Sequence, residues 1–229
     1  MILDPTDQFI THITAHCDIT DKLILEVGCG RGRITCDLAR HARRVVAIDP
    51  DEKALQAARS QIPAENVEFL CCGGESLAFP EASFDLVVYS LSLHHLPDEW
   101  MLQSLEQAAR LLKKGGKMIV IEPGGEGTLI EVEEKFGVGC GNERAAKAAA
   151  LMAMNSLAEI HPSLPVCFYT LFYFDDTEDF LMNLLPGYQN KPAAYLEEVE
   201  AFLEKHRKGE RIVLQAERAL YIFPEYLGR

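Results

Sequence analysis

"LILEVGCGRGRIT", residues 23–35, decides the fold class of this chain. An apolar run predicts a short buried strand over 23–27 and leads into three glycines at positions 28, 30 and 32. A helix is predicted to follow from about Arg31 to His41. Glycine lets the backbone come close to a ligand, and the free N–H groups at the start of a helix point toward it. The stretch therefore predicts a strand–loop–helix unit that binds a ligand through its backbone.

The second predicted strand, "RVVAID" at 44–49, ends in an acid. Asp49 lies about 20 residues after the first glycine, where a carboxylate suits the paired hydroxyls of a ribose. The dinucleotide fingerprint GxGxxG would need a glycine at position 33, which is Arg33, so the spacing here is GxGxG. A purely structural turn is the alternative for the glycines, and a helix cap is the alternative for Asp49.

Apolar strands alternate with helices along the rest of the chain, which predicts a parallel sheet covered on both faces. The further strands are expected at 66–70, 84–90, 117–122, 168–174 and 211–223. Helices are expected at 3–16, 51–62, 97–116, 176–185 and 192–206, with Asp4 or Thr6 capping the first and Gly115 ending the third. Helical stretches at 126–136 and 142–160 form an insert at about 125–165. No linker divides the chain, so 1–229 is predicted to be a single domain.

Composition narrows the class of partner. The 229 residues carry a net charge of −13, which disfavours nucleic acid and anionic membranes. Seven cysteines without a CxxC pair are typical of reduced cytosolic thiols. The first ten residues do not have the pattern of a signal peptide, and no apolar run is long enough to span a bilayer. We expect a cytoplasmic protein with neither nucleic acid nor membrane as partner, while the oligomeric state is not specified.

Three motifs carry a resemblance to a known family. "EVGCGRG" at 26–32, "FPEASFDLVVYSLSLHHLPD" at 79–98 and "LLKKGGKMIVIEP" at 111–123 resemble class I S-adenosylmethionine-dependent methyltransferases, in the small-molecule, methyltransferase type 11-like branch. The resemblance covers about residues 20–123. It implies an α/β fold with a Rossmann-like, doubly wound sheet of seven strands. That sheet would be mostly parallel, with an antiparallel C-terminal strand between the fifth and the sixth.

The same resemblance implies S-adenosylmethionine as cofactor, S-adenosylhomocysteine as its product, and a set of residues around them. The glycine loop would lie under the methionine part, Glu26 would help hold its amino group, and Asp49 would take the ribose hydroxyls. Pro50 would pack beside the adenine. The family's usual acid for the adenine amine falls on Gly73, so Glu75 or backbone groups are expected to replace it. The implied cofactor-binding set is Glu26, Gly28, Cys29, Gly30, Asp49, Pro50, Gly74, Glu75 and Ser90.

Catalytic residues are less clearly marked. His94, His95 and Glu122 lie at the predicted carboxyl ends of strands and are the candidate bases, although one of the histidines could simply pack or cap. His12 and His16 have helical spacing but no third ligand nearby in sequence, so no metal site is expected.

The resulting prediction is methyl transfer to a small organic acceptor, with the insert and the N-terminal helix covering the site. The alternatives are a nicotinamide-dependent oxidoreductase and a non-catalytic cofactor-binding protein. A nucleotide-base methyltransferase is a third alternative, but residues 90–93 read Ser-Leu-Ser-Leu where enzymes that modify base amines have an Asn/Asp-Pro-Pro-aromatic motif.

Overall fold

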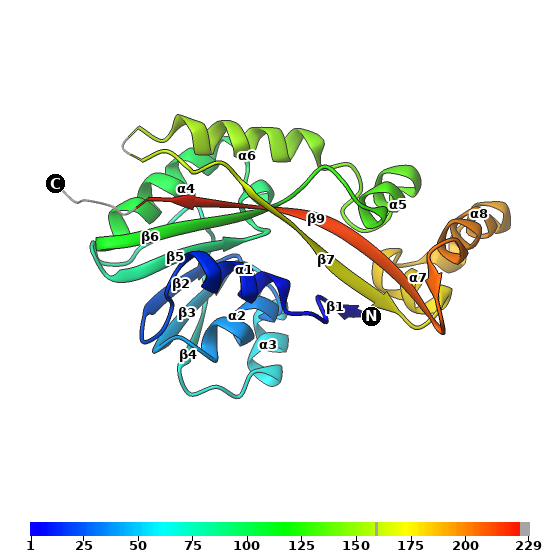
Figure 1. The fold of residues 1–229 in the computed structure, drawn as a ribbon, viewed down its shortest axis with the longest axis horizontal. Coiled ribbons are helices and arrows are strands. Elements are labelled where there is room, and N and C mark those ends of the chain that lie inside the picture. The colour runs from blue at the N-terminus through cyan, green and yellow to red at the C-terminus, as the bar shows by residue number, and fades with distance from the viewer. Residues whose placement is uncertain (159, 225–229) are drawn as a thin grey trace. The chain divides into compact units, whose positions relative to one another are not determined.

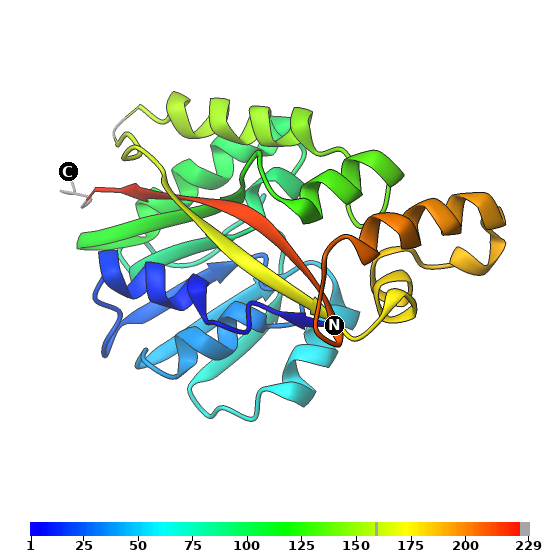
Figure 2. The same cartoon turned by 45° about the vertical axis from the view of Figure 1, so that its right-hand side comes forward.

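The computed structural model describes residues 1–158 and 160–224, and these form two compact units. Unit 1 contains Met1–Gln8, Pro123–Arg144 and Cys167–Arg218. Unit 2 contains Phe9–Glu122, Ala145–Val166 and the chain from Ala219 onward. Figures 1 and 2 show the ribbon from two directions. The predicted insert at 125–165 is divided between the units, because its first helix belongs to unit 1 and nearly all of its second helix to unit 2.

Unit 2 is built on five parallel strands. They are β2 (Leu23–Val27), β3 (Arg44–Asp49), β4 (Val67–Cys71), β5 (Phe84–Ser90) and β6 (Leu112–Pro123), in the spatial order β6-β5-β2-β3-β4. In this register Val27 lies opposite Ile48 on one side and Tyr89 on the other. Because the strands are parallel, their carboxyl ends meet at one edge of the sheet, where ligands bind in folds of this kind.

Helices cover both faces of this sheet, as the continuous apolar strands predict. On one face α4 (Asp98–Leu111) and α6 (Arg144–Ser156) pack into one core cluster with alternate residues of β2, β3, β5 and β6. The ribbon places α1 (Gln8–His16), α2 (Arg33–Ala39) and α3 (Glu52–Gln61) on the other face (Figures 1 and 2). The short helix η1 (Leu93–His95) follows β5 directly. The apolar side of α6 is therefore part of the core of unit 2.

Unit 1 contains β1 (Ile2–Leu3), most of β7 (Val166–Phe174), β8 (Arg207–Lys208) and the first part of β9 (Arg211–Phe223). Its helical elements are α5 (Thr128–Phe136), α7 (Thr177–Leu184), η2 (Tyr188–Asn190) and α8 (Ala193–Glu204). In the sheet β9 pairs with β7 on one side and with β6 on the other, as predicted for the seventh strand. Just after β6 ends, Gly124 N donates to Glu217 O of β9, and Glu217 N donates to Glu126 O. The seven predicted strands are confirmed, and the two-residue strands β1 and β8 add to them.

The prediction that the first helix begins at residue 3 is wrong. Leu3 lies in β1, opposite Phe172 of β7, and α1 begins at Gln8. Asp4 has a φ of 48°, and it precedes Pro5, which disfavours the helical conformation for the residue before it. Asp4 does act as a cap, because its Oδ1 accepts a hydrogen bond from Gln8 N at 2.9 Å. Thr6, the other predicted cap, does not take this role.

The predicted ends of two other helices are also wrong. The helix expected from Arg31 begins at Arg33, after Gly32 in the left-handed conformation. The helix expected to end at Gly115 ends at Leu111, and Gly115 lies in the irregular first part of β6. Ala82 N and Ser83 N donate to the carbonyls of Arg110 and Leu111 and so end the helix early. No helix among the described residues is long and apolar enough to cross a membrane.

Candidate active site

The glycine loop joins β2 to α2 at the carboxyl edge of the sheet. The backbone N–H groups of Gly28 and Cys29 both donate to Ile48 O, at 2.8 and 3.0 Å. Gly28 has a φ of +76°, and a Cβ there would lie 2.3 Å from Ser92 Cβ, so the position excludes any side chain. Gly30 has a φ of +53° with no atom within 4 Å of where its Cβ would be. The backbone at Gly28 thus packs closely against Ser92, whereas the space beside Gly30 is open. A loop that binds a ligand through its backbone requires such an open space.

Asp49 fixes this loop as well as facing the ligand side. Its Oδ2 accepts a hydrogen bond from Gly30 N at 2.7 Å, and its Oδ1 accepts one from Asp51 N at 2.9 Å. Each carboxylate oxygen has a second acceptor position, so two hydroxyl donors can still be received. The alternative of a helix cap is wrong for Asp49, because the N-cap of α3 is Asp51, which accepts from Lys53 N.

Glu26, at the end of β2, is completely buried. Thr35 Oγ1 donates to its Oε2 at 2.6 Å, and Ser90 Oγ donates to its Oε1 at 2.7 Å. Burial raises the pKa of the Glu26 carboxyl from 4.5 to about 6, although both hydroxyl groups act in the opposite direction. Glu26 therefore ties α2 to β5 beneath the loop. Any contact that it makes with a ligand would pass through Ser90 or a water molecule.

A cavity of about 730 Å³ opens at this edge of the sheet. It lies within unit 2 and is lined by eight of the nine predicted cofactor-binding residues and by one predicted catalytic residue: Gly28, Cys29, Gly30, Asp49, Pro50, Gly74, Glu75, Ser90 and His95. Glu26 is the predicted residue that is missing from the lining. The structure therefore brings side chains from four strand ends to one cavity of the size that small ligands occupy.

Six further residues line the cavity that the sequence did not single out, namely Val27, Leu91, Ser92, Leu96, Pro97 and Trp100. Most of them belong to one continuous run after β5. Leu91 has a φ of 57°, a costly conformation for leucine, and Ser92 Oγ donates to Val27 O at 2.5 Å. The sequence held only a partial signal for them, namely the predicted site residues Ser90 and His95 on either side of Leu91 and Ser92.

Glu75 occupies the position that a side chain at residue 73 would take. A Cβ on Gly73 would lie 2.1 Å from Glu75 Oε2 and 2.4 Å from Glu75 Cδ. Gln107 of α4 holds this loop, because its Oε1 accepts from Leu77 N at 2.7 Å and its Nε2 donates to Glu75 O at 3.3 Å. A carboxylate therefore stands where the family's acid is expected, although it is carried two residues later in the chain.

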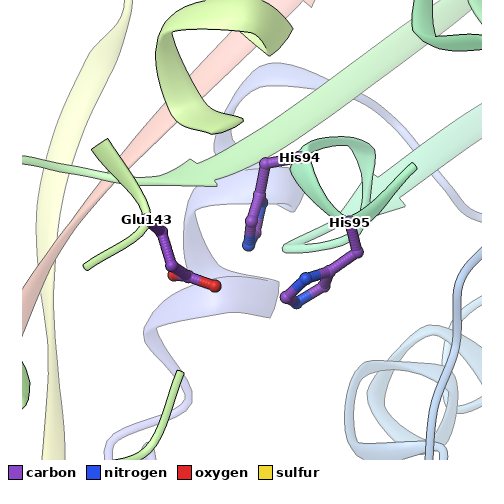
Figure 3. A group of neighbouring side chains, drawn as sticks. All are labelled: His94, His95 and Glu143. Atoms are coloured by element: carbon purple, nitrogen blue, oxygen red, sulfur yellow. The ribbon is translucent and has the colours of Figure 1, made fainter. Parts of the chain in front are cut away.

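The three predicted bases are in different environments, and Figure 3 draws the two histidines. His94 is 4% exposed, and its Nδ1 lies 2.6 Å from Oε2 of Glu122, which is also 4% exposed. Glu122 Oε1 is buried and has no hydrogen-bond partner among the described residues. His95 is exposed, lines the cavity, and has its ring centroid 4.1 Å from that of His94. Glu143, also drawn in Figure 3, belongs to unit 1 and is not counted in this site.

Of the three, His95 is thus the group that can reach a ligand in the cavity. His94 and Glu122 form a buried pair behind it, which suits a positioning or structural role.

Comparisons with known proteins agree with this geometry. Residues 25–120 match the family model described as "Methyltransferase domain". The chain is 36% identical over 104 residues to a protein of Mycobacterium tuberculosis named "Probable S-adenosylmethionine-dependent methyltransferase Rv3030", covering 45% of this chain and 36% of that protein. It is 32% identical over 175 residues to the 27-O-demethylrifamycin SV methyltransferase of Amycolatopsis mediterranei, covering 69% of this chain and 61% of that protein.

The chain therefore spans less than two thirds of the length of either relative. Among solved structures, the YcgJ protein of Bacillus subtilis has the same fold, with a TM-score of 0.60 at 16% identity over 95% of this chain and 96% of that one.

Proposed function

We propose that this chain is an S-adenosylmethionine-dependent methyltransferase and that it transfers a methyl group from that cofactor to a small organic acceptor. One observation carries the proposal. The glycine loop, the acid after β3, the carboxylate in the place of residue 73 and an exposed histidine all line one cavity of about 730 Å³. The sequence alone predicted these residues, without the cavity. That they line one cavity is therefore independent support for the family assignment.

Each part of the cavity has a recognition role in this proposal. The open backbone at Gly30 cradles the methionine part, and Asp49 accepts the two ribose hydroxyls on the oxygen positions that Gly30 N and Asp51 N leave free. Pro50 packs beside the adenine, and Glu75 accepts from its amine. Ser90 links the cavity to the buried Glu26 carboxylate, which favours the positively charged amino group.

The chemistry depends mainly on alignment. The cofactor supplies a methyl group on a sulfonium, which is already a good leaving group. The residues of the chain hold the acceptor in line with that methyl, and orientation of this kind is worth about 7–11 kcal/mol. In this proposal His95, which lines the cavity, takes a proton from an oxygen or nitrogen acceptor, and such a base adds about 100- to 10,000-fold. A thiolate acceptor would need no base.

A small acceptor is favoured over a nucleic acid by two facts. The chain carries a net charge of −13, and one of its relatives is named 27-O-demethylrifamycin SV methyltransferase. Leu91, Leu96, Pro97 and Trp100 make one side of the cavity apolar and aromatic, which suits an organic acceptor. We also propose that residues 125–165 and 1–16 wall the acceptor site.

Binding and turnover test the proposal against both alternatives. Trp100 is the single tryptophan of the chain and lines the cavity, so its fluorescence reports occupancy directly. We expect quenching and calorimetric heat with S-adenosylmethionine and S-adenosylhomocysteine but not with NAD, and formation of S-adenosylhomocysteine with at least one member of a metabolite panel. Tight NAD binding with no response to the other two would favour the oxidoreductase. Cofactor binding with no turnover across a broad panel would favour a non-catalytic binding protein.

A further inference from the structure

A second cavity, of about 260 Å³, lies at the opposite edge of the same sheet. Lys22 comes directly before β2, and Leu86, near the amino end of β5, pairs with Lys117 of β6. These strands are parallel and carry the first cavity at their carboxyl ends, so the two cavities belong to opposite edges of unit 2. The full lining is Cys17, Asp18, Lys22, Asp85, Leu86, Lys114, Gly115, Gly116 and Lys117.

Three lysines line this cavity. Within residues 1–158 and 160–224, Lys22, Lys114 and Lys117 form no side-chain ion pair or hydrogen bond at contact distance. Each ammonium group carries three donors, and no neighbouring acceptor receives them. In a chain with a net charge of −13, three such cations around one hollow form a local positive patch.

The two acids of the lining offset these lysines only in part, although Lys22 interacts electrostatically with both and helps to lower their pKa values. Asp85 Oδ2 accepts from Leu23 N at 2.8 Å and from Lys113 Nζ at 2.9 Å. Asp18 Oδ1 accepts from Thr20 N at 3.0 Å and is exposed to solvent. Lys113, which pairs with Asp85, is outside the lining. With Lys113 included, four lysines therefore stand against two acids around the cavity, which leaves an excess of positive charge.

The floor and rim of the cavity suit a compact ligand. Burial raises the pKa of the Cys17 thiol, so the floor is uncharged. Gly115 has a φ of +79°, and this turn carries Lys114 and Lys117 to the same rim. A water molecule takes up about 30 Å³ of liquid volume, so a cavity of about 260 Å³ has room for a ligand of several heavy atoms.

We propose that this cavity binds a small polyanion that carries phosphate groups, held by Lys22, Lys114 and Lys117. Lysine ammonium groups act as point charges with rotatable donors, which suits the tetrahedral array of phosphate oxygens. The site is separate from the cofactor cavity and does not depend on methyl transfer. The competing explanation is that Lys114 only complements the carboxyl end of α4, which ends at Leu111. In that case replacing it would change stability without changing anion binding.

Inorganic pyrophosphate is the probe for the test. It is titrated into the full chain by calorimetry at constant ionic strength, with and without saturating S-adenosylhomocysteine. The variants are Lys114→Gln and Lys117→Gln. The matched control is Lys53→Gln, which removes the same charge from an exposed position on α3. We expect the wild-type chain to bind pyrophosphate, each cavity variant to bind it at least about tenfold more weakly, and the control to bind as the wild type does.

Saturation with S-adenosylhomocysteine is expected to leave pyrophosphate binding unchanged. The proposal is wrong if the wild-type chain gives no binding beyond that of chloride at the same ionic strength. It is also wrong if Lys53→Gln loses as much affinity as Lys114→Gln, or if pyrophosphate competes with S-adenosylhomocysteine, which would put it in the first cavity. Lys114 is exposed, so its variant decides the matter even if Lys117→Gln fails to fold.

Discussion

Replacing Glu26 by glutamine is expected to raise the free energy of unfolding above that of the wild type, and to raise it more at neutral pH than at acid pH. The Glu26 carboxyl is fully buried, and its pKa is about 6 where its ordinary value is 4.5. Below pH 4.5 the carboxyl is protonated in both the folded and the unfolded chain, so its ionisation does not lower the free energy of unfolding. Between these two values the unfolded chain loses the proton first, so folding becomes less favourable as the pH rises. Above about pH 6 the folded protein carries the full cost of a buried charge.

The size of this cost follows from the two pKa values. They differ by about 1.5, and one pKa unit corresponds to about 1.4 kcal/mol, so the cost is about 2 kcal/mol. Glutamine is neutral throughout and keeps the same shape. Its oxygen can accept from one of the two hydroxyl groups that now serve Glu26, those of Thr35 and Ser90, while its amide donates to the other, because a hydroxyl can rotate to accept.

The assay is urea unfolding of the wild type and of Glu26→Gln at pH 4 and at pH 7. From pH 4 to pH 7, the free energy of unfolding of the variant is expected to rise by about 2 kcal/mol relative to that of the wild type, whatever the difference between the two proteins at pH 4. Glu81→Gln, at an exposed position in the same unit, is the control and should show no such change. A difference between Glu26→Gln and the wild type that does not depend on pH would refute the reasoning, because it would mean that the carboxyl titrates at its ordinary value.

Four other outcomes are expected. Asp49→Ala should weaken binding of S-adenosylhomocysteine by about 2–3 kcal/mol in calorimetry, and it should also lower the melting temperature because two backbone donors lose their acceptor; unchanged affinity in a folded variant would contradict the ribose assignment. His95→Ala should reduce turnover about 100- to 10,000-fold with unchanged cofactor affinity if the acceptor needs a base, whereas His94→Ala should mainly lower stability; the reverse order would exchange their roles. A chelator should leave turnover intact, and recovery of lost activity by one divalent ion would contradict this. Amide exchange at residues 125–165 and 1–16 should slow when S-adenosylhomocysteine binds; equal rates in both states would count against a lid.

The sequence predicted the cavity-lining residues well where the backbone alone determines their position. Gly28 and Gly30 follow β2 and Asp49 ends the neighbouring parallel strand β3, so strand pairing brings them together whatever the side chains do elsewhere. His94 and His95 were equivalent in the sequence, because adjacent residues on a turn cannot be assigned to the core or to the cavity from their order. The helix η1 separates them, burying His94 against Glu122 and leaving His95 at the cavity.

Two of the three wrong helix ends have one cause in common. At Leu3 and at Gly115 the local pattern favoured a helix, but a partner distant in sequence took the backbone groups instead. Leu3 pairs with β7, and the last carbonyls of α4 accept from Ala82 and Ser83. Such partners are set by tertiary structure, and propensity summed over neighbouring residues does not contain them.

Gly73 and Glu75 show how a departure from a family pattern can preserve the chemistry. The sequence presented a missing acid, and two explanations were open, another carboxylate or backbone groups. A side chain at residue 73 would collide with the Glu75 carboxylate, so the two positions compete for one space. The absence of a Cβ at Gly73 is what lets Glu75 fold back there, and Gln107 holds the loop that carries it. Restoring an acid at residue 73 alone should therefore displace Glu75 rather than add to it, and Gly73→Asp combined with Glu75→Ala should bind cofactor better than Gly73→Asp by itself.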